Sequence, residues 1–343
     1  MCFLLEVLYY LEDKKLFNMK ILAIETSCDD TSLAIFEDDI LITLDTKSQI
    51  KIHASTGWVV PEVAAREHAN AIFEVCENVL EKSKIKIEDI DYIAVTSHPW
   101  LIPSLLTGIT FARTLSKIFQ EPLLELNHIQ GHIFSNFLER KKEDISFPLV
   151  CLTVSWWHND IYYMSSLWEM EKIGSSQDDA AGESYDKVAK MMWLWYPGGP
   201  IISQLSTEYS QEKNKELFPR VWLKKDEFDF SFSWLKSAVK REIDKRIWLK
   251  WELDEQDKKE ISFEFQNAVN EVLAHKLISW ALQKQVKTVM LAGWVSANND
   301  LREKIRQKAW EHNLQFLHPI KNVYCMDNAA MIWILAYYKI KHW

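Results

Sequence analysis

The chain has 343 residues, of which 48% are hydrophobic, and this is enough for a large core and for two domains of about 150 residues each. No apolar run reaches the roughly 18 residues needed to span a bilayer, and the net charge of -9 argues against a broad polyanion-binding face. Five cysteines without CxxC spacing argue against a disulfide framework or a zinc knuckle and fit a reducing cytoplasm.

The first eighteen residues are partly apolar, but they lack a basic amino-terminal stretch and a small-residue cleavage site. They are therefore a poor signal peptide. A second Met stands at position 19, directly before a clear strand. We expect residues 1–18 to be a mis-assigned start or a disordered leader.

Glycine is rare in this chain and tryptophan is abundant. Average usage of about 7% would give roughly 24 glycines in a chain of this length. The sequence has 8 Gly and 16 Trp, which together make 24. This sum suggests that tryptophan stands where glycine is expected.

The first part of the chain predicts alternating strands and helices. Residues 19–27 predict a strand, and residues 28–42 predict a polar corner and a returning strand. Apolar residues recur at helical spacing from Pro61 to Lys84, and residues 90–97 and 104–119 predict a further strand and helix. This alternation indicates an α/β lobe.

The same pattern begins again after a charged segment. Residues 139–148 (ERKKEDISFP) are charged, end in Pro and predict a linker. Residues 147–167 then repeat the apolar strand, polar corner and second strand of the opening, so one architecture occurs twice. Residues 305–319 and 328–340 predict two closing helices and a short strand-like piece.

Two histidines have the spacing of metal ligands. His128 and His132 lie at i and i+4, on one face of a predicted helix and close enough to share a metal. The pattern alone is weak, because histidines in a core or in solvent are commoner. A zinc-protease helix needs Glu directly after its first His, and Ile129 stands there instead. Peptidase activity is therefore disfavoured.

A set of motifs in a fixed order resembles the TsaD family, also called Gcp or YgjD, of tRNA threonylcarbamoyladenosine transferases. The resemblance runs from Met19 to about Tyr338, nearly the whole chain. The motifs are ILAIETSCDDTSLAIF, VVPEVAAREH, NHIQGH, DDAAGESYDKVAKM, YPGGP, FDFSFSWLK, GWVSANN and MDNAAMI.

The resemblance implies an α/β fold of the actin-like ATPase (ASKHA) class, with two duplicated ribonuclease-H-like lobes around a central cleft. We expect residues 19–145 to form the first lobe, completed by a C-terminal helix at about 326–343. Residues 146–325 are expected to form the second lobe.

Tryptophan replaces glycines of the family throughout these motifs. Glycine serves where φ is positive or where the backbone approaches a phosphate, and tryptophan suits neither role. In one explanation the tryptophans are real and the nucleotide corner is blocked. In the other, UGA codons that mean glycine in the source were translated as tryptophan. The positions concerned are Trp58, Trp100, Trp156, Trp157, Trp193, Trp195, Trp234, Trp294 and Trp333.

The resemblance also assigns site residues. His128, His132 and Asp327 would hold one divalent metal, with iron expected first and zinc as the alternative. Glycines restored at 156 and 157 would let the corner cradle phosphate with its backbone N–H groups. The substrate-binding positions implied are Thr153, Val154, Ser155, Trp156, Trp157, Asp186, Gly199 and Asn298.

Three of these positions carry over with particular roles. Asp186 matches an acidic substrate-binding residue, Gly199 a close-approach glycine and Asn298 a polar contact on the adenosine side. The matching corner in the first lobe is polar and carries Thr26, Ser27, Asp29 and Asp30.

The activity implied is transfer of threonylcarbamoyl from threonylcarbamoyl-AMP to N6 of adenosine 37 in tRNAs that read codons beginning with A. The implied partners are tRNA, a TsaB-like paralogue and a TsaE-like ATPase, with no membrane. The sequence identifies no general base. A non-catalytic scaffold of this fold would lack the two histidines, and a sugar kinase would not need a histidine metal site. A pseudoenzyme follows if Trp156 and Trp157 are genuine.

Overall fold

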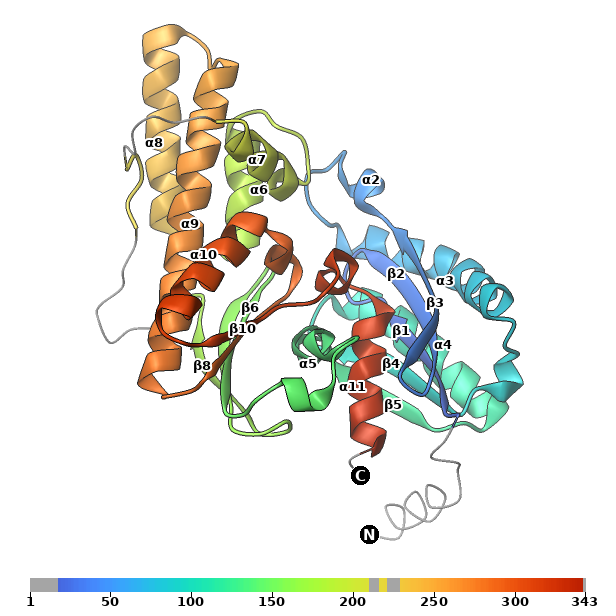
Figure 1. The fold of residues 1–343 in the computed structure, drawn as a ribbon. Coiled ribbons are helices and arrows are strands. Elements are labelled where there is room, and N and C mark those ends of the chain that lie inside the picture. Colours follow the sequence, from blue (N-terminus) through green and yellow to red (C-terminus); the bar gives the residue numbers. More distant parts are fainter. Residues whose placement is uncertain (1–17, 210–215, 221–228, 342–343) are drawn as a thin grey trace. The chain divides into compact units, whose positions relative to one another are not determined.

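The computed structural model describes residues 18–209, 216–220 and 229–341 (Figure 1). The predicted leader, apart from Asn18, lies outside the described residues. The chain divides into two compact units. The first contains residues up to 51, 59–138 and those from 327 onward, and the second contains residues 52–58 and 139–326.

The first unit is built on a five-stranded sheet in the order β3-β2-β1-β4-β5. β1 pairs antiparallel with β2 and parallel with β4, while β2–β3 is antiparallel and β4–β5 parallel. The central strands are apolar and buried on both faces, as a covered sheet requires. Their bounds are β1 (Lys20–Glu25), β2 (Asp30–Glu37), β3 (Ile40–Ser48), β4 (Tyr92–His98) and β5 (Leu123–Asn127).

Helices cover this sheet. α3 and α4 pack on it through one apolar cluster, and α11 packs against β1 and β2. Pro61 starts α3 at a position where its missing N–H costs nothing, and Lys84 ends it in the left-handed conformation. The helices of this unit are α3 (Pro61–Ser83), α4 (Ile102–Phe119), α5 (His128–Phe134) and α11 (Ala329–Lys341), while α2 (Ile50–His53) is divided between the two units.

The second unit repeats the strand arrangement of the first. Its sheet has the order β10-β9-β6-β7-β8, with β6–β7 and β7–β8 antiparallel and β6–β9 and β9–β10 parallel. Read from β8, each strand matches one of the first sheet in order and direction, so the predicted duplication is confirmed. The strands are β6 (Leu149–Val154), β7 (Asn159–Met164), β8 (Met170–Ser175), β9 (Thr288–Ala292) and β10 (Gln315–Leu317).

A long helix, α9, organises the core of the second unit. It packs against α7, α8 and α10 and buries an almost continuous series of apolar side chains. Asp254 and Asp257 close its first turn as a reciprocal capping box. The helices are α6 (Ala181–Met191), α7 (Gly198–Thr207), α8 (Ser233–Lys250), α9 (Glu255–Gln283) and α10 (Asn299–Glu311).

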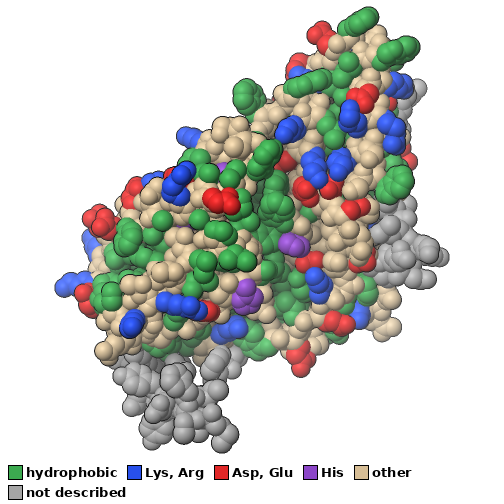
Figure 2. Space-filling model, turned by 180° about the vertical axis from the view of Figure 1, so that it is seen from behind, with side chains coloured by type: hydrophobic (Ala, Val, Ile, Leu, Met, Phe, Trp, Pro, Cys, Tyr) green, Lys and Arg blue, Asp and Glu red, His purple; other side chains and the backbone are tan. Residues whose placement is uncertain are grey.

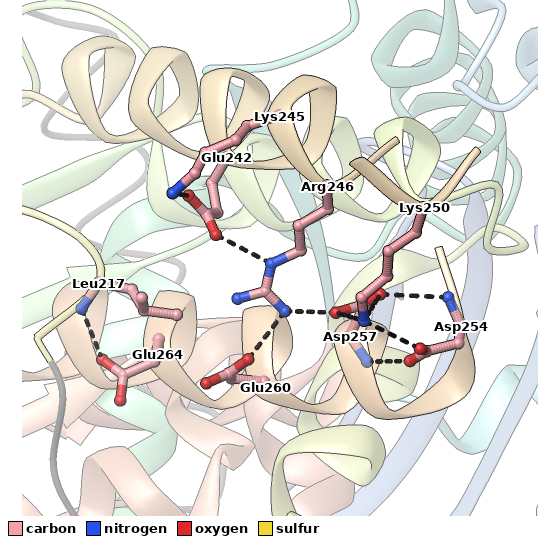
Figure 3. Close-up of polar contacts among 9 residues, drawn as sticks. All are labelled: Leu217, Glu242, Lys245, Arg246, Lys250, Asp254, Asp257, Glu260 and Glu264. Atoms are coloured by element: carbon pink, nitrogen blue, oxygen red, sulfur yellow. Dashed lines mark hydrogen bonds and ion pairs between the residues drawn. The ribbon is translucent and has the colours of Figure 1, made fainter. Parts of the chain in front are cut away.

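An ion network joins α8 to α9 (Figure 3). The Arg246 guanidinium lies 2.8 Å from both Asp257 and Glu260 and 2.9 Å from Glu242. Lys250 adds a second cation, 2.9 Å from Asp257. Arg246 is buried, and burial lowers its pKa, but the carboxylates around it outweigh this effect and raise the pKa above its ordinary value. The network therefore satisfies charges that would otherwise be costly to bury.

The expected elements are found, with one correction. The helices predicted at 61–84 and 104–119 and the strand at 90–97 are confirmed as α3, α4 and β4. The returning strand predicted through residue 42 is wrong at its end, because Asp38 turns with a φ of 52° and residues from Ile40 start a separate strand, β3.

Two observations concern the surface of the protein. No helix among the described residues is long and apolar enough to cross a membrane. On the face drawn in Figure 2, Lys and Arg side chains are interspersed with Asp and Glu.

Candidate metal centre and hairpin corner

The predicted metal ligands come together in the first unit. α5 starts directly after β5, and the Asn127 side chain caps it by accepting the Gln130 N–H at 2.9 Å. His128 and His132 therefore share one face of α5, with ring centroids 4.6 Å apart. Asp327, just before α11, places its Oδ1 3.0 Å from His132 Nε2 and 3.7 Å from His128 Nε2.

These distances fit a single metal ion. Ligand atoms about 2.1 Å from a tetrahedral metal lie about 3.4 Å apart, and one ligand atom of each of these residues lies within 4.8 Å of the others. Two imidazoles and one carboxylate leave coordination positions open for a substrate oxygen. The three residues could therefore bind a metal, while its identity stays a prediction.

The two histidines are almost fully buried and face the Asp327 carboxylate. Burial lowers the pKa of His128, but Asp327 and Glu25 outweigh it and raise the pKa above its ordinary value. Burial likewise raises the pKa of Asp327, while His128 and His132 lower it overall. Asp327 is thus held as an anion, the form that binds a cation.

The first-unit corner after β1 is packed and acidic. Thr26 donates to the Ser104 carbonyl at 3.0 Å, and a Cβ on Gly108 would lie 2.3 Å from Thr26 Oγ1. Burial and the charge on Asp327 raise the pKa of Asp29 to about 6. Burial and the charge on Asp29 raise the pKa of Asp30 to about 8. These carboxyls therefore take up protons far more readily than exposed ones.

The second-unit corner follows β6 and contains the predicted phosphate-binding residues. Thr153 and Val154 end β6, and the Ser155 N–H donates to the His158 carbonyl at 2.8 Å to close the turn. Within the described part of the chain, the backbone N–H groups of Trp156 and Trp157 have no acceptor. Two N–H groups at a turn are a common anion-binding arrangement.

Two glycines that sequence reasoning missed hold this corner. A Cβ on Gly182, at the start of α6, would lie 2.6 Å from Trp156 Cα. A Cβ on Gly293, after β9 at a φ of 84°, would lie 2.6 Å from the Val154 carbonyl oxygen. Neighbouring backbone therefore approaches the corner from two sides. In the sequence, the signal for these two positions was that GESY and AGW each keep a glycine in a chain that has only 8.

Asp186 lies beside the corner on α6. It accepts a hydrogen bond from Gly198 N–H at 2.6 Å and another from the Trp156 indole N–H. Burial raises its pKa, against these hydrogen bonds. The Trp156 indole therefore forms a hydrogen bond with the same carboxylate that was predicted to bind substrate.

The two glycines of YPGGP differ. A Cβ on Gly198 would lie 2.4 Å from the Ala189 side chain, so Gly198 is the one that packing requires. A Cβ on Gly199 would meet nothing within 4 Å. No protein atom therefore requires glycine at position 199. That a ligand approaches the Gly199 backbone closely stays a prediction.

Asn298 is engaged in the fold of the second unit. Its Oδ1 caps α10 by accepting the Leu301 N–H at 3.0 Å and also accepts from Asn270 at 3.2 Å. Its Nδ2 donates to Gln266 at 2.8 Å. Capping explains the residue type at this position without a ligand, and the adenosine contact stays a prediction.

Several tryptophans have backbone conformations typical of glycine. Trp193 follows α6 at a φ of 57°, Trp251 caps α8 at 71°, and Trp100 has a φ of 152°. After α6, the Leu194 N–H bonds the Ala189 carbonyl and the Trp193 N–H bonds the Lys190 carbonyl, the pattern of a helix end closed by glycine. The seven other non-glycine residues of positive φ in the described chain are Asn, Asp, Lys, Gln or Glu.

The exposure of the tryptophan side chains also suggests positions suited to glycine, with one exception. Trp251 is 90% exposed and Trp195 82%, although tryptophan normally buries a large apolar surface. Trp333 is 1% exposed and stacks on Phe36 in the core. The indole has packing partners at position 333 and almost none at 195 and 251.

Comparison with known proteins places this chain in one family. The family model described as tRNA N6-adenosine threonylcarbamoyltransferase matches residues 41–334. The protein of that name from Fusobacterium nucleatum is 41% identical over 325 residues, covering 94% of this chain and 92% of that protein. The one from Staphylococcus haemolyticus is 43% identical over 319 residues, covering 93% of this chain and 90% of that protein.

A solved structure agrees in fold. HypF from T. kodakarensis matches with a TM-score of 0.63 and 14% identity, over 95% of this chain and 49% of that one. At this identity the likeness shows the fold alone, and it confirms the expected α/β ASKHA class. The family model, which matches residues 41–334, and the two relatives above show that the chain is a transferase that belongs to the tRNA N6-adenosine threonylcarbamoyltransferase family.

Proposed function

We propose that this chain transfers threonylcarbamoyl from threonylcarbamoyl-AMP to N6 of adenosine 37 in tRNAs that read codons beginning with A. The observation that carries the proposal is the group of His128, His132 and Asp327, preassembled with metal-ligand spacing in a chain of this family. A bound divalent metal would polarise the carbamoyl carbonyl or hold the threonyl carboxylate.

The reaction needs help at the leaving group as well. The adenine amine is a poor nucleophile, so the bond from the carbamoyl carbon to the AMP phosphate oxygen breaks more readily when the developing phosphate charge is stabilised. We assign that role to the corner at 155–157, where the backbone N–H groups of residues 156 and 157 are free to donate within the described chain. No residue is assigned as general base.

The proposal includes partners. The net charge is -9, and the face drawn in Figure 2 mixes Lys and Arg with Asp and Glu, so this face offers tRNA no broad basic surface. We therefore propose that a TsaB-like paralogue and a TsaE-like ATPase assist the chain, with a separate synthase supplying the adenylate. The anticodon loop presents unstacked bases, which makes its adenosine reachable. We place this chemistry in the cytoplasm.

We further propose that residues 156 and 157 are glycine in the working protein. Three observations support this reading: the combined count of Gly and Trp, the positive φ at Trp100, Trp193 and Trp251, and the large exposure of several indoles. Glycine at 156 would also free Asp186 from the indole N–H.

A second candidate is a pseudoenzyme of the same fold that serves as a non-catalytic scaffold and has kept the two histidines. The observation in its favour is the Trp156 indole on Asp186, with Trp157 packed edge-on against it at a centroid distance of 4.1 Å. If these side chains are genuine, the corner is filled.

Peptide mass spectrometry of protein from its natural source decides between the two. Glycine masses at 156 and 157 over UGA codons would support the transferase with an open corner. Tryptophan masses there would overturn that proposal and leave the scaffold.

The metal role is tested by a His128→Ala, His132→Ala double variant in a tRNA modification assay with threonylcarbamoyl-AMP. We expect modification to fall by at least about 10²-fold, because the ligands that hold the metal are removed. His312→Ala changes an exposed histidine outside the centre and serves as the control. Full modification by the double variant would remove the metal from the mechanism.

A further inference from the structure

Glu25, the last residue of β1, is a completely buried carboxylate that no assigned role explains. Its Oε1 accepts the Ser27 N–H at 2.6 Å, and its Oε2 accepts the Thr96 hydroxyl at 2.5 Å. Among the described residues, no Lys or Arg forms an ion pair with it. A buried carboxylate without a cation is costly and is retained where it performs a task.

Glu25 faces one specific nitrogen of the metal centre. Its Oε2 lies 3.2 Å from His128 Nδ1, and Ser27 Oγ lies 3.0 Å from the same nitrogen. An ionised carboxylate can only accept hydrogen bonds, so the ring nitrogen that faces it carries the proton. His128 then keeps its lone pair on Nε2, the nitrogen 3.7 Å from Asp327.

The other histidine has no such support. His132 Nδ1 is buried and has no hydrogen-bond partner among the described residues, and its Nε2 faces Asp327 at 3.0 Å. Only His128 is therefore oriented by a carboxylate that is not itself a predicted metal ligand. Partners of this kind commonly change metal affinity 10- to 100-fold.

We propose that Glu25 is a positioning residue of the metal centre, which holds His128 as the Nδ1–H tautomer and aims Nε2 at the metal. The proposal rests on the metal role of His128, His132 and Asp327 proposed above. Thr96 and the Ser27 N–H fix the Glu25 carboxylate in turn, so three elements that are separate in sequence, β1, β4 and α5, converge on one ring.

The test measures Co²⁺ and Zn²⁺ affinity of the full-length chain, stripped of metal, by competition with a chromophoric chelator. Glu25→Gln keeps the shape but provides an amide N–H that can donate to Nδ1 and permit the other tautomer. We expect its affinity to fall about 10- to 100-fold, with a changed Co²⁺ absorption spectrum and partial recovery in Glu25→Asp. Glu88→Gln makes the same change at an exposed carboxylate outside the centre, and should bind metal like the parent.

Two further measurements separate the possible failures. If the His128→Ala, His132→Ala variant binds metal as well as the parent, the metal site itself is wrong. If that variant loses binding while Glu25→Gln binds like the parent, Glu25 alone is wrong. ¹⁵N imidazole spectra of the unaltered metal-free chain cover the case of a Glu25 variant that does not fold. They should show His128 protonated at Nδ1, and protonation at Nε2 would overturn the inference.

Discussion

At the scale of single residues, the candidate site brings several carboxyl groups close together, and only Asp327 among them faces histidine partners. Asp29, Asp30 and Asp327 lie near one another in the first unit, and burial and mutual repulsion raise the pKa of Asp29 and of Asp30. Asp30 Oδ1 is buried without a partner in the described chain. Such groups lower stability and are typical of binding sites.

Asp30→Asn should remove a pH dependence of stability. The pKa of Asp30 is about 8 in the folded chain and about 3.9 when unfolded, so between these values the unfolded chain binds fewer protons and stability falls as pH rises. In the metal-free protein, we expect Asp30→Asn to match the parent near pH 4 and to exceed it by about 1–3 kcal/mol at pH 8.5. Urea unfolding at both pH values measures this.

The control for that experiment is Asp39→Asn, which changes an exposed carboxyl on the following turn. Its stability profile should follow the parent at both pH values. An Asp30→Asn profile that keeps the parent's decline above pH 5 would show that Asp30 is not the titrating group.

Site residues were predictable from sequence where a local spacing defined them, as for the two histidines, or where a family motif did, as for Asp327. The i, i+4 spacing of His128 and His132 was enough to place both rings on one face. Glu25 was not foreseeable, because its contacts join residues about a hundred positions apart in the chain. Gly182 and Gly293 were missed for the same reason, since each is required by backbone from a distant part of the chain. The corner at 155–156 packs against Gly182, and Val154 at the end of β6 packs against Gly293.

At the scale of elements, periodicity and capping residues were good guides. Pro61 and the apolar spacing after it defined α3 almost to the residue. β3 was missed as a separate strand because its residues are mostly partly exposed or exposed, so no clear apolar run marks it. The end of α8 was equally hidden, because a tryptophan stands where glycine would have signalled a stop.

The same substitution should have opposite effects at two positions of α8. Trp251→Gly relieves a left-handed residue at a φ of 71° and should raise the free energy of unfolding by about 1 kcal/mol. Trp248→Gly, three residues earlier and still within the helix, should lower it by about 0.5–1 kcal/mol. Both indoles are at least 80% exposed, so lost packing contributes little to either. Denaturant midpoints compare them, and a loss at both positions would contradict the glycine-like reading of position 251.

At the scale of the whole molecule, the chain repeats one strand arrangement in two units, and the predicted site residues are divided between them. The metal ligands belong to the first unit, and the corner at 155–157 with Asp186 and Gly199 belongs to the second. Each corner follows the first strand of its own sheet, β1 or β6, so duplication of one fold supplies two polar turns. The first turn carries acidic side chains, and the second has two backbone N–H groups without an acceptor in the described chain.

This division predicts where metal binding will stabilise the chain. Every predicted ligand lies in the first unit, so Zn²⁺ at about a hundred times its dissociation constant should stabilise that unit by about 2.7 kcal/mol. Hydrogen exchange should slow in α5, α11 and β1, the elements that carry or orient the ligands, and should change little in α8 and α9. Protection that rises equally in α8 and α9 would mean that both units unfold together, and protection of α8 and α9 alone would place the metal elsewhere.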